Sequence, residues 1–147
     1  YKRNINTNFT VAGLQGSDAA SGATLGYSGT PAGNTVTAAV GSYTITPSAL
    51  TLSSGSTSNY SISYVAGTLT VSKATLTITA EDKSKLYGAA VPALTYTYTG
   101  LVNGDAAPST LPAIITTALA SSSVDSYPIT VSAAADANYT INYVLQK

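Results

Sequence analysis

The sequence contains no cysteine, histidine, methionine or tryptophan, and these absences exclude several kinds of site. Without cysteine the chain has no disulfide framework and no thiolate metal ligand, although many secreted bacterial proteins share this property. Without histidine a Ser-His-Asp triad cannot form, and no motif singles out a Ser-Lys dyad among the many serines. The composition therefore argues against a hydrolase that uses an activated nucleophile.

Charge is scarce as well, which narrows the range of partners. Six basic and six acidic residues give a formal net charge of zero, and only 8% of residues are charged. This balance provides no basic patch for nucleic acid or an anionic membrane surface, so we exclude both partners. The longest apolar stretch, residues 111–120, is far shorter than the ~20 residues of a membrane-spanning helix, so no membrane insertion is expected.

One long segment, residues 19–72, contains no Asp, Glu, Lys or Arg at all. A soluble monomer normally carries surface charge, so this segment indicates glycan cover, an extracellular setting or a surface buried against other subunits. A plain β surface rich in serine and threonine is the alternative interpretation.

The most informative feature that is present is an internal repeat. Three motifs recur in the same order, and their offset shrinks from 87 to 84 to 79 residues, as tandem modules with small loop deletions would produce. They are Gly-Leu followed by Asp-Ala-Ala (13–20 and 100–107), SYTIT and SYPIT (42–46 and 126–130), and NYSISYV and NYTINYV (59–65 and 138–144). We therefore predict two modules, residues 1–72 and 73–147, and such repetition is typical of spacer or fibre proteins.

Apolar and hydroxyl residues alternate along several segments, which predicts half-buried β-strands. The segments are 43–47, 59–65, 68–71, 74–80, 94–99, 127–132 and 138–144. Helical signals are weak, although residues 20–26 and 113–120 could hold a turn or two. The fold class is therefore all-β, with short and mostly antiparallel strands in two small β-sandwich or β-grasp-like modules. Because residues 71–75 lack a Gly/Pro linker, we expect one module to run directly into the next, as an elongated rod.

These motifs resemble the MBG domains of the YGX type, which form tandem arrays in large bacterial surface and adhesin-like proteins. The second module carries ATLTITAEDKSKLYG (74–88), with the namesake Tyr87 and Gly88, then YTGLVNGD (98–105), DSYPITVSA (125–133) and ANYTINYV (137–144). The first module matches from AGLQGSD (12–18) to GTLTVSK (67–73). The resemblance implies an extracellular structural or adhesive repeat, at the cell surface, with no catalytic residues to carry over.

Each module departs from the family pattern at one end. The first has no counterpart of 74–88, and the second stops before a counterpart of 67–73. We expect one module to lack its opening strand and the other its closing strand, which would leave an apolar groove that recruits a strand from another chain. The alternative is a sequence cut without regard to module boundaries. The residues expected to pair between subunits are Tyr1, Phe9, Val11, Leu76, Ile78, Tyr139, Ile141, Tyr143 and Leu145.

The charged residues offer no convincing catalytic or metal site. Asp18 and Asp105 share one repeat position, which indicates a turn, and Glu81 and Asp82 lie beside lysines in an expected solvated hairpin. No calcium-loop motif occurs, and a looser site that uses Asp105, Asp125 or Asp136 is the remaining alternative. The interior lysines, Lys73, Lys83 and Lys85, fit a linker and a hairpin better than a covalent Lys-Asn crosslink. We expect no enzyme, metal or cofactor.

Most of the eleven tyrosines occupy equivalent positions in the two modules, which favours packing over a single ligand site. Tyr87 is also expected to pack, with Gly88 allowing a turn. Three sequons, at Asn8, Asn59 and Asn138, would suit glycosylation, and the last two are expected to point outward. The leading hypothesis is a non-enzymatic extracellular fibre subunit or adhesin stalk that self-associates by donor-strand pairing. The alternative is an adhesin module that binds a host or cell-surface glycan or protein.

Overall fold

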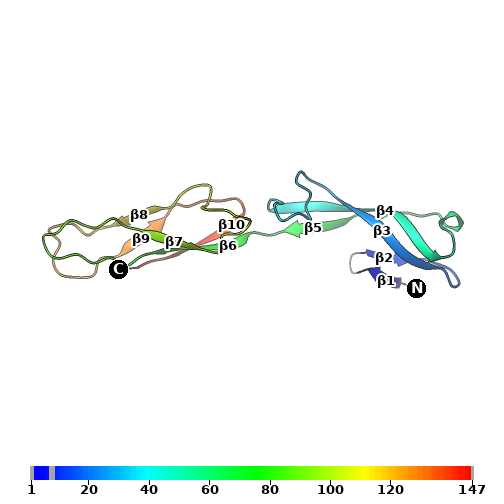
Figure 1. The fold of residues 1–147 in the computed structure, drawn as a ribbon, viewed down its shortest axis with the longest axis horizontal. Helices are drawn as coiled ribbons and strands as arrows, with labels where there is room; N and C mark the ends of the chain where they lie inside the picture. The colour runs from blue at the N-terminus through cyan, green and yellow to red at the C-terminus, as the bar shows by residue number, and fades with distance from the viewer. Residues whose placement is uncertain (1, 7–8, 147) are drawn as a thin grey trace. The chain divides into compact units, whose positions relative to one another are not determined.

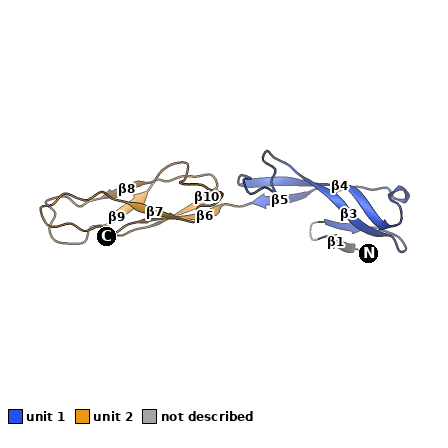
Figure 2. Cartoon of the chain, viewed as in Figure 1, with its two compact units in different colours: residues 1–71 blue, residues 72–147 orange. Residues whose placement is uncertain are grey.

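The structure is a computed structural model that describes residues 2–6 and 9–146. The chain divides into two compact units, Tyr1–Val71 and Ser72–Lys147, so the division falls one residue before the expected one (Figure 2). Tyr1, expected to pair between subunits, and Asn8, a sequon, lie outside the described residues. In the described part of the chain, no helix has the length and apolar character needed to cross a bilayer.

The chain is almost entirely β, as the alternation predicted (Figure 1). Unit 1 contains β1 (Lys2–Asn6), β2 (Phe9–Ala12), β3 (Ala19–Tyr27), β4 (Gly41–Ser54), the short 3-10 helix η1 (Thr57–Asn59) and β5 (Gly67–Val71). Unit 2 contains β6 (Ala74–Ala80), β7 (Tyr96–Thr99), β8 (Ala113–Thr116), β9 (Ile129–Ser132) and β10 (Tyr139–Val144). The weak helical signals at 20–26 and 113–120 were wrong, because β3 and β8 form there by pairing with β4 and β9.

Unit 2 is a small sandwich built around β6. One sheet has the order β10-β6-β7, in which β6 runs parallel to β10 and antiparallel to β7, and the other pairs β8 with β9. The alternation of β6 turns Leu76, Ile78 and Ala80 inward, where they are at most 1% exposed. They pack with Ile129 and Val131 of β9 and Tyr139 of β10. The period-two pattern of 74–80 thus predicted the core of this unit.

Unit 1 consists of the antiparallel sheet β3-β4-β5 and the β1–β2 hairpin, which lies next to β3 (Figure 1). The presence of β1 corrects the expectation that this unit lacks an opening strand. Val11 and Tyr98 occupy equivalent positions in the repeat. Because Arg3 pairs with Val11 and Ile78 pairs with Tyr98, Arg3 stands at the position of Ile78, and β1 matches β6 from the position of Thr77 onward. The positions of Ala74–Leu76 have no counterpart among the described residues.

The strand expected at 59–65 is absent from unit 1, which is the main error of the sequence prediction. Residues 60–66 form no strand, whereas the equivalent β10 pairs with Ala74–Thr79 of β6 in unit 2. Among the described residues no strand pairs with 60–66, and a strand forms only where its backbone groups find another strand. Among the described residues of unit 1, Ala20 is the one buried hydrophobic residue.

We predict that Ile78→Ala lowers the free energy of unfolding of unit 2 by about 2–5 kcal/mol, because it opens a cavity at a side chain that is 0% exposed. The matched variant Ile115→Ala, on β8 and 63% exposed, should change it by about 0.5 kcal/mol or less. Urea titration of the full chain, followed through NMR signals of unit 2, measures both. Equal losses for the two variants would contradict the central place of β6.

Candidate binding surfaces

A tyrosine hydroxyl closes the same turn in both units. In unit 1 the Tyr60 hydroxyl donates to Oδ2 of Asp18 at 2.6 Å and accepts from the Gln15 N–H at 3.1 Å. In unit 2 the Tyr139 hydroxyl donates to Oδ2 of Asp105 at 2.7 Å and accepts from the Val102 N–H at 2.9 Å. Both aspartates therefore lie at equivalent turns, as the repeat predicted, and their carboxylates hold a neighbouring tyrosine. We call this arrangement the Tyr-Asp clasp.

The clasp raises the pKa of the phenol in both units. For Tyr60 the main cause is the hydrogen bond to the Asp18 carboxylate, which stabilises the neutral phenol, while the Gln15 N–H opposes the shift. For Tyr139 the Val102 N–H lowers the pKa, but the Asp105 hydrogen bond, burial and nearby carboxylate charge together raise it. Both tyrosines therefore stay protonated donors at neutral pH, which suits a structural role.

The remaining paired tyrosines also tie the same parts of each unit together. Tyr43 donates to the Ala39 carbonyl at 2.7 Å, and Tyr127 donates to the equivalent Ser123 carbonyl at 3.1 Å. Tyr64 accepts from the Leu50 N–H at 2.9 Å, and Tyr143 donates to the Ala134 carbonyl at 3.1 Å. These contacts tie each ring within its own unit at equivalent positions, although Tyr64 is 45% exposed. That the tyrosines form no ligand site stays a prediction.

Unit 1 has an apolar groove of about 640 Å³, which we call the strand groove. Its walls are residues 9–14, from β2 into the following turn, and residues 60–67, and its floor is formed by apolar residues of β3 and β4. Phe9 and Val11, both expected to pair with another chain, lie in the first wall. In the second wall Ile62 is 38%, Tyr64 45% and Val65 82% exposed. None of the described residues that line the groove is charged.

The other residues expected to pair between subunits lie in unit 2. Both edges of β6 are hydrogen bonded within the unit, and Leu76, Ile78 and Tyr139 are buried there. Ile141 and Tyr143 are half-buried against the same core, whereas Leu145 is 56% exposed. Pairing through the buried residues would require unit 2 to open. Intersubunit pairing at all these positions stays a prediction.

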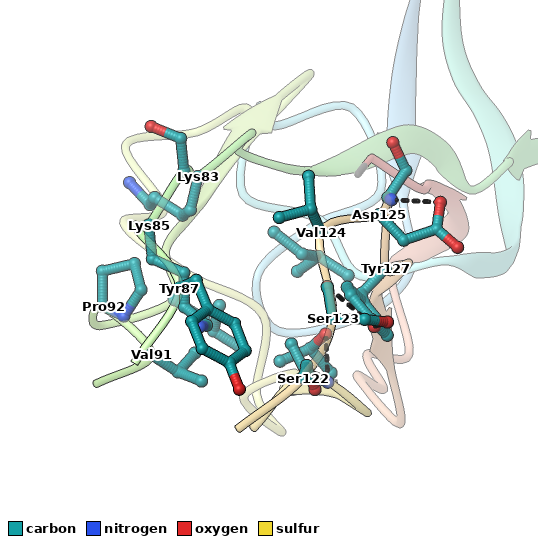
Figure 3. Close-up of a pocket in the computed structure, with 16 residues that line it drawn as sticks. Lys83, Lys85, Tyr87, Val91, Pro92, Ser122, Ser123, Val124, Asp125 and Tyr127 are labelled. Atoms are coloured by element: carbon teal, nitrogen blue, oxygen red, sulfur yellow. Dashed lines mark hydrogen bonds between the residues drawn. The ribbon is translucent and has the colours of Figure 1, made fainter. Parts of the chain in front are cut away.

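A second hollow, the loop pocket, lies in unit 2 between residues 83–94 and 116–127 and measures about 240 Å³ (Figure 3). Lys85 Nζ and the Gly88 N–H both donate to the Ala120 carbonyl at 3.2 Å and join the two loops. Tyr87 is 72% exposed and Val124 is 93% exposed. The expectation that Tyr87 packs was wrong, because most of its side chain is exposed at the pocket, whereas Gly88 has the positive φ of the expected turn.

The carboxylates are held as structural acceptors. Glu81 forms an ion pair with Lys83 at 3.2 Å, and its pKa is lowered first by the Thr95 hydroxyl and then by Lys83. Asp136 accepts from the Ser109 hydroxyl, the Asn138 N–H and the Ser109 N–H, which lower its pKa in that order. Among the described residues, no group of three or more potential metal-ligating acids gathers.

The sequons described by the structure are both on the surface. Asn59 ends η1 and Asn138 precedes β10, and both residues are exposed. Their exposure permits modification, and glycosylation itself stays a prediction.

Sequence reasoning missed the loop pocket, because nothing in the residue pattern places 83–94 beside 116–127.

The chain belongs to the MBG domain (YGX type) family. The family model matches twice, at residues 2–70 and 76–146, and each match falls within one of the two units (Figure 2). No curated protein and no solved structure matches the chain. Tandem MBG repeats are typical of surface and adhesin-like proteins, so the family assigns the chain to this general class.

We predict that Tyr60→Phe changes the alkaline stability of unit 1. The folded pKa of Tyr60 lies above its ordinary value of 10.0, so the clasp stabilises fully below that value and its contribution is lost as pH rises through the raised pKa. The variant should therefore unfold at lower temperature near neutral pH, and its difference from wild type should shrink above about pH 10.

Thermal unfolding by circular dichroism, from about pH 7 to about pH 11, measures this difference. Tyr27→Phe, on β3 and outside the clasp, is the control for removing a tyrosine hydroxyl. A Tyr60→Phe curve that stays parallel to wild type across the alkaline range would refute the stabilising role of the clasp.

Proposed function

We propose that this chain is a non-enzymatic structural segment of an extracellular surface protein, in which two MBG repeats act as a stalk or fibre unit. The observation that carries the proposal is the construction of the same clasp twice. A unique catalytic or binding site would place its functional groups in one copy. Here the repeated aspartates and tyrosines serve equivalent turns in both units, which supports a mechanical role for each repeat.

The composition of the surface supports an extracellular setting. The uncharged segment 19–72 covers most of unit 1 and exposes many serine and threonine hydroxyls. A neutral surface of this kind has no long-range electrostatic repulsion to keep copies apart. It therefore favours lateral packing, and its sequon asparagine, Asn59, is exposed and open to a glycan.

Strand pairing is the proposed mode of extension. Along the chain, only Ser72 and Lys73 separate the last strand of unit 1 from the first strand of unit 2. Unit 1 keeps an apolar groove beside a segment that has no strand partner among the described residues. Unpaired backbone next to apolar surface is the arrangement that recruits a strand from another chain.

We predict that the wild-type chain forms filaments or concentration-dependent oligomers, seen by negative-stain electron microscopy and by sedimentation. Val65→Lys, in the wall of the strand groove, should prevent them, because it places a charge at a surface meant to be buried. Val124→Lys, 93% exposed in a unit 2 loop, should leave assembly unchanged. If the chain is monomeric at every concentration, the fibre hypothesis is wrong and the stalk hypothesis remains.

A second candidate function is carbohydrate binding at the loop pocket, favoured by the exposed ring of Tyr87 beside Pro92 and Val91 (Figure 3). Aromatic rings at the mouth of a small pocket are suited to stacking on sugars. We predict that Tyr87→Ala weakens binding of an oligosaccharide found in a glycan array by about tenfold. Leu119→Ala, 65% exposed and outside the pocket, is the control. The absence of any array signal would remove this function.

A further inference from the structure

We infer that β8 is a contact between copies of this chain, at which two β8 strands pair antiparallel about a two-fold axis through Ile115. The paired strands would join the β8–β9 sheets of two copies into one continuous sheet. This inference rests on the proposed structural function and deepens it, because it names a lateral contact in unit 2 and the register of that contact.

The outward face of residues 111–119 is apolar, although an antiparallel sheet with one solvated face normally carries polar residues there. Exposure alternates strictly along this segment, so that Ile114 is half-buried against the core while Ile115 is 63% exposed. The outward side chains are Leu111 (62% exposed), Ala113, Ile115, Thr117 and Leu119 (65% exposed). Unit 2 thus exposes a stripe of apolar side chains that its own core does not use.

The equivalent strand of unit 1 shows that the repeat does not need this stripe. Thr46 and Thr130 end the repeated motifs SYTIT and SYPIT, and they pair with Gly26 and Ile115, respectively. Gly26 therefore stands in unit 1 where unit 2 has Ile115. Because the strand forms with glycine at this outward position, folding alone does not require isoleucine there. The isoleucine of unit 2 thus points to a contact outside the unit.

The outer edge of β8 has no strand partner in the part of the chain that the structure describes. β8 is the terminal strand of its sheet, and Thr116 lies opposite Ile129 of β9. The backbone groups of Ile129 bond Gln146 at 2.8 and 3.4 Å, so they point away from β8. Since such groups alternate in direction along an antiparallel pair, those of Ile114 and Thr116 point to the outer edge. This edge presents backbone donors and acceptors to a partner strand.

The features that normally keep an edge strand from pairing are absent from β8. Native edges are protected by charged residues, proline or bulges. The equivalent edge strand of unit 1, β3, has register shifts at three places, whereas β8 has neither a shift nor a charged residue. Pro112, which has no N–H, precedes β8 and limits the ladder to the residues that follow it.

The position of this edge does not depend on the ends of the sequence. In unit 1 the last strand, β5, pairs with β4 and leaves β3 at the edge of the sheet. Gln146 bridges to Ile129 of β9 at the position equivalent to the pairing of Gly67 with Ile45. A strand that continued this pairing would lie along β9, on the side away from β8.

The outward residues of the segment are self-complementary, which identifies the partner as a second copy. An antiparallel pairing centred on Ile115 places this residue opposite Ile115 of the second copy. The same register places Ala113 opposite Thr117, and it places Leu111 opposite Leu119. Apolar cross-strand pairs of this kind stabilise a sheet. The stripe therefore covers itself when two copies pair.

The backbone and the charge distribution permit the same register. Ile114 of one copy would face Thr116 of the other, so the outward-pointing groups of both strands meet as a hydrogen-bonded pair. No charged residue lies between Asp105 and Asp125. The two-fold axis consequently brings no like charges together along the paired strands.

The absence of cysteine from the chain allows a test with single-cysteine variants of the full chain in a glutathione redox buffer. Ile115→Cys should form a disulfide-linked homodimer, because directly opposite residues of a non-hydrogen-bonded pair have Cα atoms about 4.5 Å apart, within disulfide range. Ala113→Cys alone should not, because its two copies would lie about 13 Å apart along the strands. An equimolar mixture of Ala113→Cys and Thr117→Cys should crosslink at least about tenfold faster than Ala113→Cys alone.

Two controls separate this register from random collision. Val124→Cys, which is 93% exposed and lies outside β8, measures the collision rate. Adding Ile115→Lys to both members of the Ala113→Cys and Thr117→Cys pair should remove the heterodimer, because two ammonium groups would meet at the centre of the contact. Since Ile115 is exposed, this change leaves the core of unit 2 intact.

The inference would be overturned by equal rates for Ala113→Cys alone and for the mixture, by an Ile115→Cys rate no higher than that of Val124→Cys, or by a heterodimer that survives Ile115→Lys. Its failure is distinct from failure of the fibre, which Val65→Lys tests in unit 1. Register-specific dimers without filaments support the β8 contact and remove the fibre, whereas filaments without such dimers overturn the β8 contact alone.

Discussion

The fold of unit 2 depends on a central strand that pairs with another strand along each edge and buries the side chains of its inner face. In unit 2, β6 supplies three of the six residues in the buried core and pairs with a strand on each side. Burial of Leu76 and Ile78 alone is worth roughly 3–6 kcal/mol, which is comparable with the whole net stability of a small domain. In unit 1, where β1 matches β6 only from the position of Thr77 onward, Ala20 is the one buried hydrophobic residue among the described residues.

The sequence predicted the parts of the fold that local pattern determines. Alternation placed β6 and β5 within a residue of their observed ends, and the repeat located Asp18, Asp105 and the paired tyrosines at equivalent turns. It failed at residues 60–66, because strand formation there depends on a partner that is distant in sequence. It failed at Tyr87 for a related reason, since the exposure of a loop side chain depends on which other loop packs beside it.

The scarcity of charge explains why tyrosine has such a large part in both units. Turns need donors and acceptors, and in a chain with 8% charged residues these come from phenols, hydroxyls and backbone groups. A tyrosine also buries a large apolar ring while its hydroxyl reaches a polar partner, so one residue serves both the core and the turn. The clasp shows both roles, because Tyr139 is 3% exposed and its hydroxyl still forms hydrogen bonds with Asp105 and with the Val102 N–H.

The same scarcity determines how the strands within a unit are held in register. Specific pairing through charged side chains is excluded for a surface like residues 19–72, so register has to come from backbone ladders and from the alternation of apolar and hydroxyl residues. A shift of one residue would turn every apolar side chain of a β6-like strand outward. The alternation that builds the core of unit 2 thus also specifies the register of β6 against β7 and β10, without any charged contact.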